Sequence, residues 1–341
     1  MSGLTLGGGL SFFSNRYGWA CDNVDSYELV TASGSIIHVS ANSYPDLYWG
    51  LRGGGGNFGV VTQFNLNTIV QGKMWGGARY FRNNSFPAVL DAYYNFATKG
   101  STQDPDAAQI VSFGYLAGMG YLGSAQLHYI KPVENASVFH EFNAIPAIQS
   151  STGIRTHSEL VILLDEGVPY GIRNTYWNMS FKVNRDFFTF IIDTLFARLP
   201  SIIDVAGILP AMSIQAITTP QLTQMQKNGG NALGLDPCEG PYFILNLATS
   251  WNNSADDARI FKFHANFFDT VKSEAKSRGL DNNFIYMNYA SQFEDPIAGY
   301  GAANKEKLKE ISRKYDPTQV FQELNPGYFK LEGPPNPNSP S

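Results

Sequence analysis

Alternating hydrophobic and polar residues predict short strands in the first 67 residues of the chain, where glycines separate the runs. Residues 27–31 and 35–39 flank a Ser-Gly pair at positions 33–34, which is typical of a hairpin turn. The alternation returns at residues 60–66, after a stretch rich in glycine. This part of the chain is therefore expected to be rich in strands.

A different pattern extends from residue 68 to residue 283, where strand-like runs alternate with amphipathic helices. The strand-like runs are residues 109–113, 124–130, 158–164, 178–183 and 242–248. The clearest helix spans about residues 255–278, because apolar residues recur on one face, Asp256 lies in the first turn and Gly279 follows the end. The pattern predicts an α+β fold with helices on one face of an antiparallel sheet.

The C-terminal region is expected to contain one further helix and a disordered tail. Residues 303–315 predict an amphipathic helix with Leu308 and Ile311 facing inward, and Pro317 ends it. Residues 332–341 are rich in proline, glycine and asparagine, so they are expected to be disordered.

Composition narrows the classes of function. A chain of 341 residues with 43% hydrophobic residues exceeds the size at which single cores tend to split, so two structural units are expected. The net charge is −5 and the basic residues are scattered, which predicts no surface for nucleic acid. No apolar run approaches the roughly 20 residues of a membrane span, and the first residues do not resemble a signal peptide. The five histidines lack the spacing of metal ligands, so no metal site is expected.

The glycine-rich residues 54–59 match the pattern G-x-G-x-x-G of dinucleotide-binding loops. That loop needs a strand before it and a helix after it, because the helix N-terminus binds the pyrophosphate. Here Ser43 and Pro45 predict a short helix before the glycines, and the strand at 60–66 follows them. Two interpretations remain open, a turn that joins helix to strand or a loop that lets backbone approach a ligand closely.

Two further groups of residues suit a ligand. Residues 7–9 are all glycine, and the pairs Tyr17-Gly18 and Asp22-Asn23 follow them, a pattern that fits either a flat cofactor lying on backbone or an ordinary turn region. Residues 284–290 resemble a strand, whose alternation places Tyr286 and Asn288 on one face. This phenol and amide either hydrogen-bond one ligand or form the polar face of a strand.

Five stretches occur in a fixed order between residues 3 and 331. They are Gly3 to Gly9 (GLTLGGG), Tyr17 to Val24 (YGWACDNV), Asp46 to Thr62 (DLYWGLRGGGGNFGVVT), Tyr286 to Tyr289 (YMNY) and Tyr315 to Phe321 (YDPTQVF). In this order they resemble the berberine-bridge-enzyme-like family of FAD-linked oxidoreductases, in particular its fungal members.

The resemblance implies the second half of a PCMH-type FAD-binding domain and a substrate domain with a large antiparallel sheet covered by helices. It implies an FAD cofactor and hydride transfer from an alcohol, sugar or secondary metabolite to the flavin, with oxygen as the electron acceptor. The implied cofactor contacts are Gly3, Leu4, Gly7, Gly8, Gly9, Tyr17, Gly18, Asp22, Asn23, Gly59, Val60, Val61, Tyr286 and Asn288. Residues 206–235 contain no acid, although plant members have a catalytic glutamate in that region, so Tyr286 is the candidate base and Gln215 a candidate substrate contact.

The resemblance also predicts a division of the chain by role. The expected parts are 1–67 as the second FAD-binding subdomain, 68–283 as the substrate domain, 284–331 as a return segment of the FAD-binding domain and 332–341 as the tail. Family members carry a first subdomain with a pyrophosphate loop and a tethering histidine before the position of Gly3. Neither has a counterpart in this sequence, so this chain is expected to be impaired in flavin binding and oxidase activity.

The alternative is a non-catalytic fragment or degenerate relative that acts at most as a ligand-binding module. The expected partner is a small-molecule substrate, with no nucleic acid and no membrane. Family members are often secreted, and the sequence leaves the compartment and the oligomeric state open.

Overall fold

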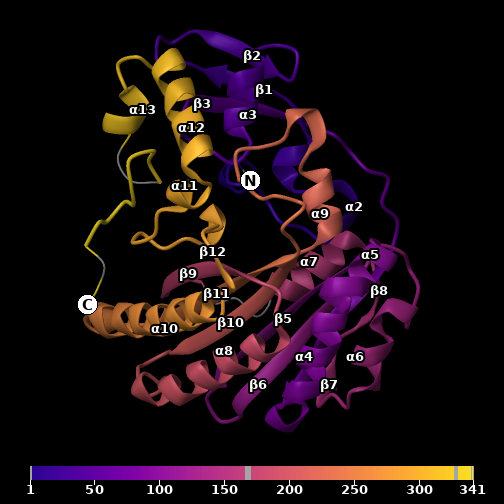
Figure 1. Ribbon diagram of the computed structural model, residues 1–341. Coiled ribbons are helices and arrows are strands. Elements are labelled where there is room, and N and C mark those ends of the chain that lie inside the picture. The colour runs from indigo at the N-terminus through magenta and orange to yellow at the C-terminus, as the bar shows by residue number, and fades with distance from the viewer. Residues whose placement is uncertain (1, 166–169, 326–328, 339, 341) are drawn as a thin grey trace. The chain divides into compact units, whose positions relative to one another are not determined.

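The computed structural model describes residues 2–165, 170–325, 329–338 and 340 (Figure 1). The chain forms two compact units. The first contains residues 1–69, 220–240 and 283–339, and the second contains 70–219, 241–282 and the last two residues. The division predicted from sequence is therefore wrong for residues 220–240, which fold with the first unit because their side chains and backbone hydrogen-bond to residues near its N-terminal end.

The first unit contains a small antiparallel sheet, which within the described residues has three strands in the order β2-β1-β3. The strands are β1 (Val24–Val30), β2 (Ile36–Ser40) and β3 (Val60–Leu66). The helices are α1 (Ser2–Leu6), α2 (Ser14–Tyr17), α3 (Pro45–Leu51), α9 (Thr219–Gln224), α11 (Pro296–Gly299), α12 (Ala302–Tyr315) and α13 (Val320–Glu323). The register of β1 against β2 places Leu29 opposite Ile37 and confirms the predicted hairpin.

The glycine-rich loop at 54–59 joins the end of α3 to the start of β3, as predicted, and no helix begins after it. Ser43, which was expected to cap this helix because serine is a common N-cap residue, does not do so. Ser43 forms an isolated β-bridge with Ser40, and Tyr44 occupies the N-cap with a left-handed φ of 58°. The bridge holds the Ser43 backbone away from the helix, and the N-cap side chain makes no capping hydrogen bond.

The second unit is dominated by a large antiparallel sheet, with nine strands among the described residues in the order β12-β9-β11-β10-β5-β6-β4-β7, and with β8 beside β4. The strands are β4 (Met74–Arg82), β5 (Ala107–Leu116), β6 (Gly120–Tyr129), β7 (Gln149–Ser150), β8 (Gly153–Arg155), β9 (Arg173–Lys182), β10 (Leu209–Ile217), β11 (Tyr242–Trp251) and β12 (Asp281–Asn282). The predicted α+β class is confirmed.

Helices cover one face of this sheet (Figure 1). They include α4 (Phe86–Asn95), α8 (Arg185–Arg198) and α10 (Asp257–Ser277), while α5 (Ser101–Gln103), α6 (His140–Ala144) and α7 (His157–Asp165) are shorter. The Tyr93 hydroxyl of α4 donates to the Ile214 carbonyl, and the ring of Phe188 in α8 lies 4.7 Å from that of Phe243 in β11. These rings fill an apolar core between the helices and the sheet.

The opposite face of the sheet is polar and uncharged along its centre. In the strand register Asn178, Asn246, Ser213, Ser112 and Ser124 lie directly opposite one another on five neighbouring strands. Side chains alternate between faces along a strand, so these residues point away from the helix-covered core. The sheet therefore separates an apolar face that stabilises the fold from a face of hydroxyl and amide groups.

Two predicted strands are wrong. Residues 158–164 form helix α7, because Thr156 and Glu159 make a capping box in which each side chain bonds the backbone N–H of the other. Residues 284–290 contain the 3-10 turn η8 (Met287–Tyr289), which begins with a hydrogen bond from the Tyr289 N–H to the Tyr286 carbonyl.

The described part of the predicted tail is attached to the first unit. The Asn336 N–H donates to the Gln292 carbonyl at 2.8 Å, and Lys330 and Gly333 form a β-bridge. The structure thus gives part of this segment backbone contacts, and the disorder of residues 332–341 stays a prediction; positions 339 and 341 lie outside the described residues. Among the described helices, none is long and apolar enough to cross a membrane.

The buried histidine His264 predicts a pH-dependent loss of stability. This residue of α10 has a fully buried side chain, its Nε2 lies 2.8 Å from the Thr249 hydroxyl, and burial lowers its pKa to about 3. An unfolded chain binds this proton near pH 6.5, so the free energy of unfolding falls by about 1.4 kcal/mol per pH unit between pH 6.5 and 3. His264→Gln is expected to remove this contribution.

Urea denaturation at pH 7, 5.5 and 4.5 measures the difference. His128 is also buried, with a pKa of about 3, so the wild-type slope has two sources and only the difference between wild type and variant isolates His264. The exposed His38→Gln serves as the control. An equal pH slope in wild type and His264→Gln would refute the assignment.

Candidate functional site

A glycine turn follows helix α1 at the start of the first unit. Gly8 and Gly9 have φ values of 126° and 95°, which side chains other than glycine rarely adopt. The Gly9 carbonyl accepts from the Ala20 N–H and the Gly8 carbonyl from the Cys21 N–H, both at 2.8 Å. The turn is thereby fixed to the segment that contains the other predicted cofactor contacts.

Tyr286 and Asn288 contact this turn. The Tyr286 hydroxyl oxygen accepts from the backbone N–H groups of Gly9 and Leu10, each at 3.1 Å. The Asn288 amide donates to the Tyr286 hydroxyl at 2.9 Å and to the Leu4 carbonyl at 3.0 Å. Residues from both ends of the sequence therefore form one hydrogen-bonded group, and the turn at η8 rather than a strand brings the phenol and the amide together.

The surroundings of Tyr286 suit positioning better than proton abstraction. Its side chain is buried, and burial raises the pKa of the phenol far above neutral, although hydrogen bonds from Leu10, Asn288 and Gly9 oppose this shift. Three donors already point at its oxygen. A phenol with a raised pKa stays protonated at neutral pH and is not available to accept a proton, so the geometry favours a role in holding the Gly9–Leu10 backbone; the catalytic role of Tyr286 stays a prediction.

A cavity of about 740 Å³ lies beside α1, the start of β3 and α13. Its lining includes Gly3, Leu6, Gly59, Val60, Val61 and Phe321. Four of the predicted cofactor contacts therefore line one cavity, whose size is typical of small-molecule sites.

The lining of this cavity suits a flat aromatic group. A Cβ added at Gly3 would meet no atom within 4 Å, so backbone is exposed there to a ligand. At Gly59 a Cβ would lie 2.7 Å from the Val30 carbonyl oxygen, which excludes any side chain from that wall. Val60 is half exposed and offers apolar surface. These residues fit the ring system of a flavin.

The predicted contacts between residues 17 and 23 mostly support the loop itself. The Asn23 amide donates to the Tyr17 carbonyl at 2.9 Å and to the Trp19 carbonyl at 2.8 Å. Gly18 has a φ of 86°, which allows the sharp turn. Asp22 is buried and accepts from the Trp19 N–H at 2.9 Å, so its carboxylate faces the protein interior.

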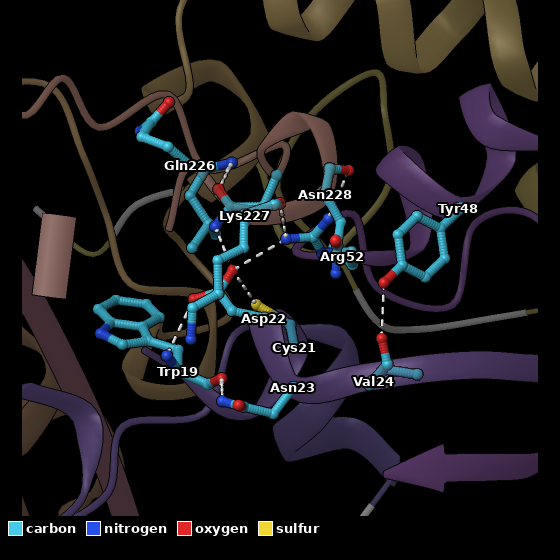
Figure 2. A network of polar contacts seen from close by, with 12 residues as sticks. Trp19, Cys21, Asp22, Asn23, Val24, Tyr48, Arg52, Gln226, Lys227 and Asn228 are labelled. Carbon is cyan, nitrogen blue, oxygen red and sulfur yellow. Dashed lines mark hydrogen bonds and ion pairs between the residues drawn. The ribbon is translucent and has the colours of Figure 1, made fainter. Parts of the chain in front are cut away.

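Arg52 is a central residue that the sequence analysis did not single out (Figure 2). Its side chain and that of Asp22 are both fully buried, with Nη2 of Arg52 3.3 Å from Oδ1 of Asp22. Buried charges are costly unless they are paired, so a lone arginine inside a glycine-rich stretch is the signal that could have indicated a buried partner.

Gln215, the predicted substrate contact, lies in the second unit on the polar face of the sheet. Its Oε1, the Ser180 hydroxyl and Oδ1 of Asn246 are buried and have no hydrogen-bond partner among the described residues. β11 lies between β9 and β10, and Ser180 and Gln215 both lie opposite Ile244. Buried polar atoms are normally satisfied, so three such atoms on adjacent strands indicate a place for a ligand or water.

The described residues contain no group of three or more His, Cys, Asp or Glu side chains arranged to hold a metal ion.

Comparison with known proteins agrees with this arrangement. The family model "Berberine and berberine like" matches residues 285–325, which include Tyr286 and Asn288. FAD-dependent monooxygenase sdcF of Emericella nidulans is 32% identical over 344 residues, covering 97% of this chain and 70% of the relative. The chain belongs to the berberine-bridge-enzyme-like family of FAD-dependent oxidoreductases.

Other family members show the same extent of similarity. FAD-dependent monooxygenase tpcD of Cochliobolus heterostrophus is 34% identical over 97% of this chain and 66% of its own length. The chain thus spans about two thirds of the length of these relatives. In fold it is similar to the crystal structure of 6-hydroxy-D-nicotine oxidase from Arthrobacter nicotinovorans, with a TM-score of 0.74 and 20% identity over 99% of this chain and 70% of that one.

The unpaired hydroxyl of Ser180 predicts an unusual response to truncation. Removing a buried hydroxyl that lacks a partner removes its desolvation cost, so Ser180→Ala is expected to raise the free energy of unfolding by about 1 kcal/mol. Ser112→Ala is the matched control, because the Ser112 hydroxyl bonds that of Ser213 at 2.8 Å and its loss is expected to destabilise by about 1 kcal/mol.

Chemical denaturation of both variants without ligand checks the contrast. Equal destabilisation by the two substitutions would show that Ser180 is satisfied in the folded protein and would remove the reason to place a ligand there.

Proposed function

We propose that this chain forms one wall of the flavin site and the substrate-binding sheet of an FAD-dependent oxidoreductase that oxidises a small neutral molecule by hydride transfer. The observation that carries the proposal is the contact between the N-terminal glycine turn and the Tyr286-Asn288 pair, beside a cavity lined by Gly3 and Gly59. When bound, FAD supplies the electron sink of the reaction, with molecular oxygen as the proposed acceptor.

The roles of this chain's own residues follow from their positions. Gly3, Gly59 and the flanking Val60 and Val61 would hold the ring system through backbone and apolar contact. Tyr286 would keep the neighbouring glycine turn in place through its two backbone hydrogen bonds. Positioning by rigid hydrogen-bonded groups is the protein's main contribution in a cofactor enzyme.

The chemistry of the sheet supports a neutral substrate with hydroxyl or carbonyl groups. On the five strands β9, β11, β10, β5 and β6, the two central rows of the polar face, opposite Asn246 and Ile244, contain serine, asparagine, glutamine and isoleucine. A carboxylate or ammonium group on the substrate would find no opposite charge in these rows, and an unpaired buried charge is strongly unfavourable. Alcohols, sugars and neutral secondary metabolites fit this surface.

About a third of each relative's length has no counterpart in these 341 residues. We therefore expect weak rather than tight FAD binding by the 341-residue chain, and oxidase activity to depend on contacts beyond it. A second candidate is a ligand-binding module without catalysis, which the unpaired polar atoms at Ser180, Gln215 and Asn246 favour because they belong to the sheet alone. Flavin binding separates the two candidates.

Filling the cavity at Gly3 is expected to weaken FAD binding at least tenfold. Gly3→Leu places a side chain into the cavity, where the glycine leaves open space, so the variant should fold normally but exclude the ring. Gly72→Leu is the control, since this glycine also has open space around it but lies in the second unit. Quenching of flavin fluorescence during titration of the 341-residue chain into FAD gives the affinities; no binding by the wild type, or equal affinities, would contradict the proposed flavin wall.

Tyr286→Phe tests whether the phenol holds the Gly9–Leu10 backbone in place or takes part in proton transfer. Removing the hydroxyl leaves the buried N–H of Gly9 without its acceptor and that of Leu10 unsatisfied, so a loss of about 2 kcal/mol in unfolding free energy is expected. Tyr44→Phe, at an exposed position, is the control. Chemical denaturation measures both variants, and an unchanged stability in Tyr286→Phe would argue against positioning and return the phenol to the role of base.

A further inference from the structure

Residues 220–240, here called the strap, connect β10 to β11 but fold with the first unit. The strap begins within α9 and contains the 3-10 turn η6 (Lys227–Gly229). Its neighbours in sequence are the two strands that carry Gln215 and Asn246 on the polar face of the sheet. One continuous segment therefore joins the proposed substrate strands to the unit that contains the proposed flavin wall.

Arg52 binds the strap through both its side chain and its backbone (Figure 2). Nη2 donates to the Lys227 carbonyl at 2.9 Å, and Nη1 donates to the Asn228 carbonyl at 3.2 Å. The Arg52 carbonyl accepts from the Ala232 N–H at 2.9 Å. Asn228 has a left-handed φ of 52°, an uncommon conformation outside glycine, which these contacts hold in place.

Asp22 joins the strap and the loop of residues 17–23 to the same guanidinium. Its Oδ1 accepts from Arg52 and from the Asn231 amide of the strap at 2.8 Å, while Oδ2 accepts from the Trp19 N–H. A single carboxylate thus fixes three chain segments. Because it is buried, none of these donors can be replaced by solvent without opening the structure.

Further hydrogen bonds connect the strap to the same loop. The Trp19 indole N–H donates to Oε1 of Gln221 at 3.0 Å, and the Lys227 ammonium group donates to the Tyr17 carbonyl at 2.9 Å. Tyr17 and its neighbours Gly18, Asp22 and Asn23 are the loop residues implied as cofactor contacts. The position of the strap and the shape of this loop are therefore set by one network.

We propose that Arg52 is a positioning residue whose planar guanidinium holds the strap and the loop of residues 17–23 in fixed positions relative to each other. The effect of this arrangement on the reaction rests on the proposed function, but the arrangement itself does not depend on it. The guanidinium serves three acceptors, the carbonyls of Lys227 and Asn228 and the carboxylate of Asp22. A lysine ammonium on a single flexible stem cannot reproduce this fork, so charge alone is not sufficient.

Hydrogen exchange of the 341-residue chain without cofactor tests the proposal. Arg52→Met is expected to speed amide hydrogen exchange at least tenfold in the peptides covering residues 17–23 and also in those covering residues 224–234. The reason is that local opening of both segments becomes about ten times more frequent. Arg52→Lys is expected to show nearly the same increase, because the fork is lost. Arg173→Met is the matched control, since it removes an exposed arginine–carboxylate pair with Asp257 in the second unit.

Trypsin gives an independent readout, because Lys227 is the only lysine or arginine between residues 220 and 240. Cleavage after Lys227 is expected to accelerate at least tenfold in both Arg52 variants and to stay unchanged in the control. If Arg52→Met does not fold, Asn231→Ala leaves Arg52 in place and removes the strap's amide on Asp22 together with the acceptor of the Leu233 N–H. It is expected to give a smaller increase, about threefold, in the same two peptides.

Three outcomes would overturn the proposal. Exchange that rises in the strap but not in residues 17–23 would show that the two segments are independent. Full rescue by Arg52→Lys would reduce the role of Arg52 to a point charge, and an even rise over both units would indicate global destabilisation instead. None of these measurements requires FAD, so a failure of flavin binding would contradict the proposed function and leave the strap's result intact.

Discussion

The buried ion pair between Asp22 and Arg52 is the interaction on which the first unit depends. Moving each charge out of water costs several kcal/mol, and the cost is offset only when the charges meet each other and every remaining hydrogen-bonding group finds a partner. Here the carboxylate has donors from Trp19 and Asn231, and the guanidinium has acceptors from Lys227 and Asn228, so most of these groups are satisfied, while Nε of Arg52 has no partner among the described residues. Removing either partner from such a pair typically costs about 3–5 kcal/mol, so the surrounding segments must all adopt the shape that satisfies it.

This constraint explains the unusual path of residues 220–240. A connection between two neighbouring antiparallel strands needs only a few residues, whereas this one makes an excursion of 21 residues into the other unit. Backbone carbonyls in an isolated loop would be satisfied by water. In this protein Arg52 supplies donors to the carbonyls of Lys227 and Asn228, which makes the excursion a structural part of the first unit.

Local patterns predicted much of the fold. The hairpin of β1 and β2, the step from α3 through glycines into β3, and helices α10 and α12 follow from periodicity and end signals within each segment. The error at residues 158–164 arose because a short apolar run suits strand and helix equally, and the capping box at Thr156 and Glu159 decided for the helix. The path of residues 220–240 was not predictable, because it depends on contacts between residues about 200 positions apart.

For the candidate site too, some features were predictable from the sequence and others were not. Gly3, Gly59, Val60 and Val61 were implied by resemblance to a family, and they line one cavity. The pairing of Tyr286 with Asn288 was also anticipated, but for the wrong reason, because a 3-10 turn rather than the pleat of a strand brings them together.

The two-faced sheet of the second unit has a consequence for how such proteins diversify. Residues that pack against α4, α8 and α10 and residues that face the opposite side alternate along each strand, so a substitution at Ser213 or Gln215 alters the chemistry of the polar face without changing the volume packed beneath the helices. Residues that determine stability and residues that determine the chemistry of the polar face therefore alternate along each strand, and each set can change in evolution without the other. In a sheet of this kind, one set of neutral hydrogen-bonding groups can replace another, and a new substrate can be accepted, while the residues packed under the helices stay the same.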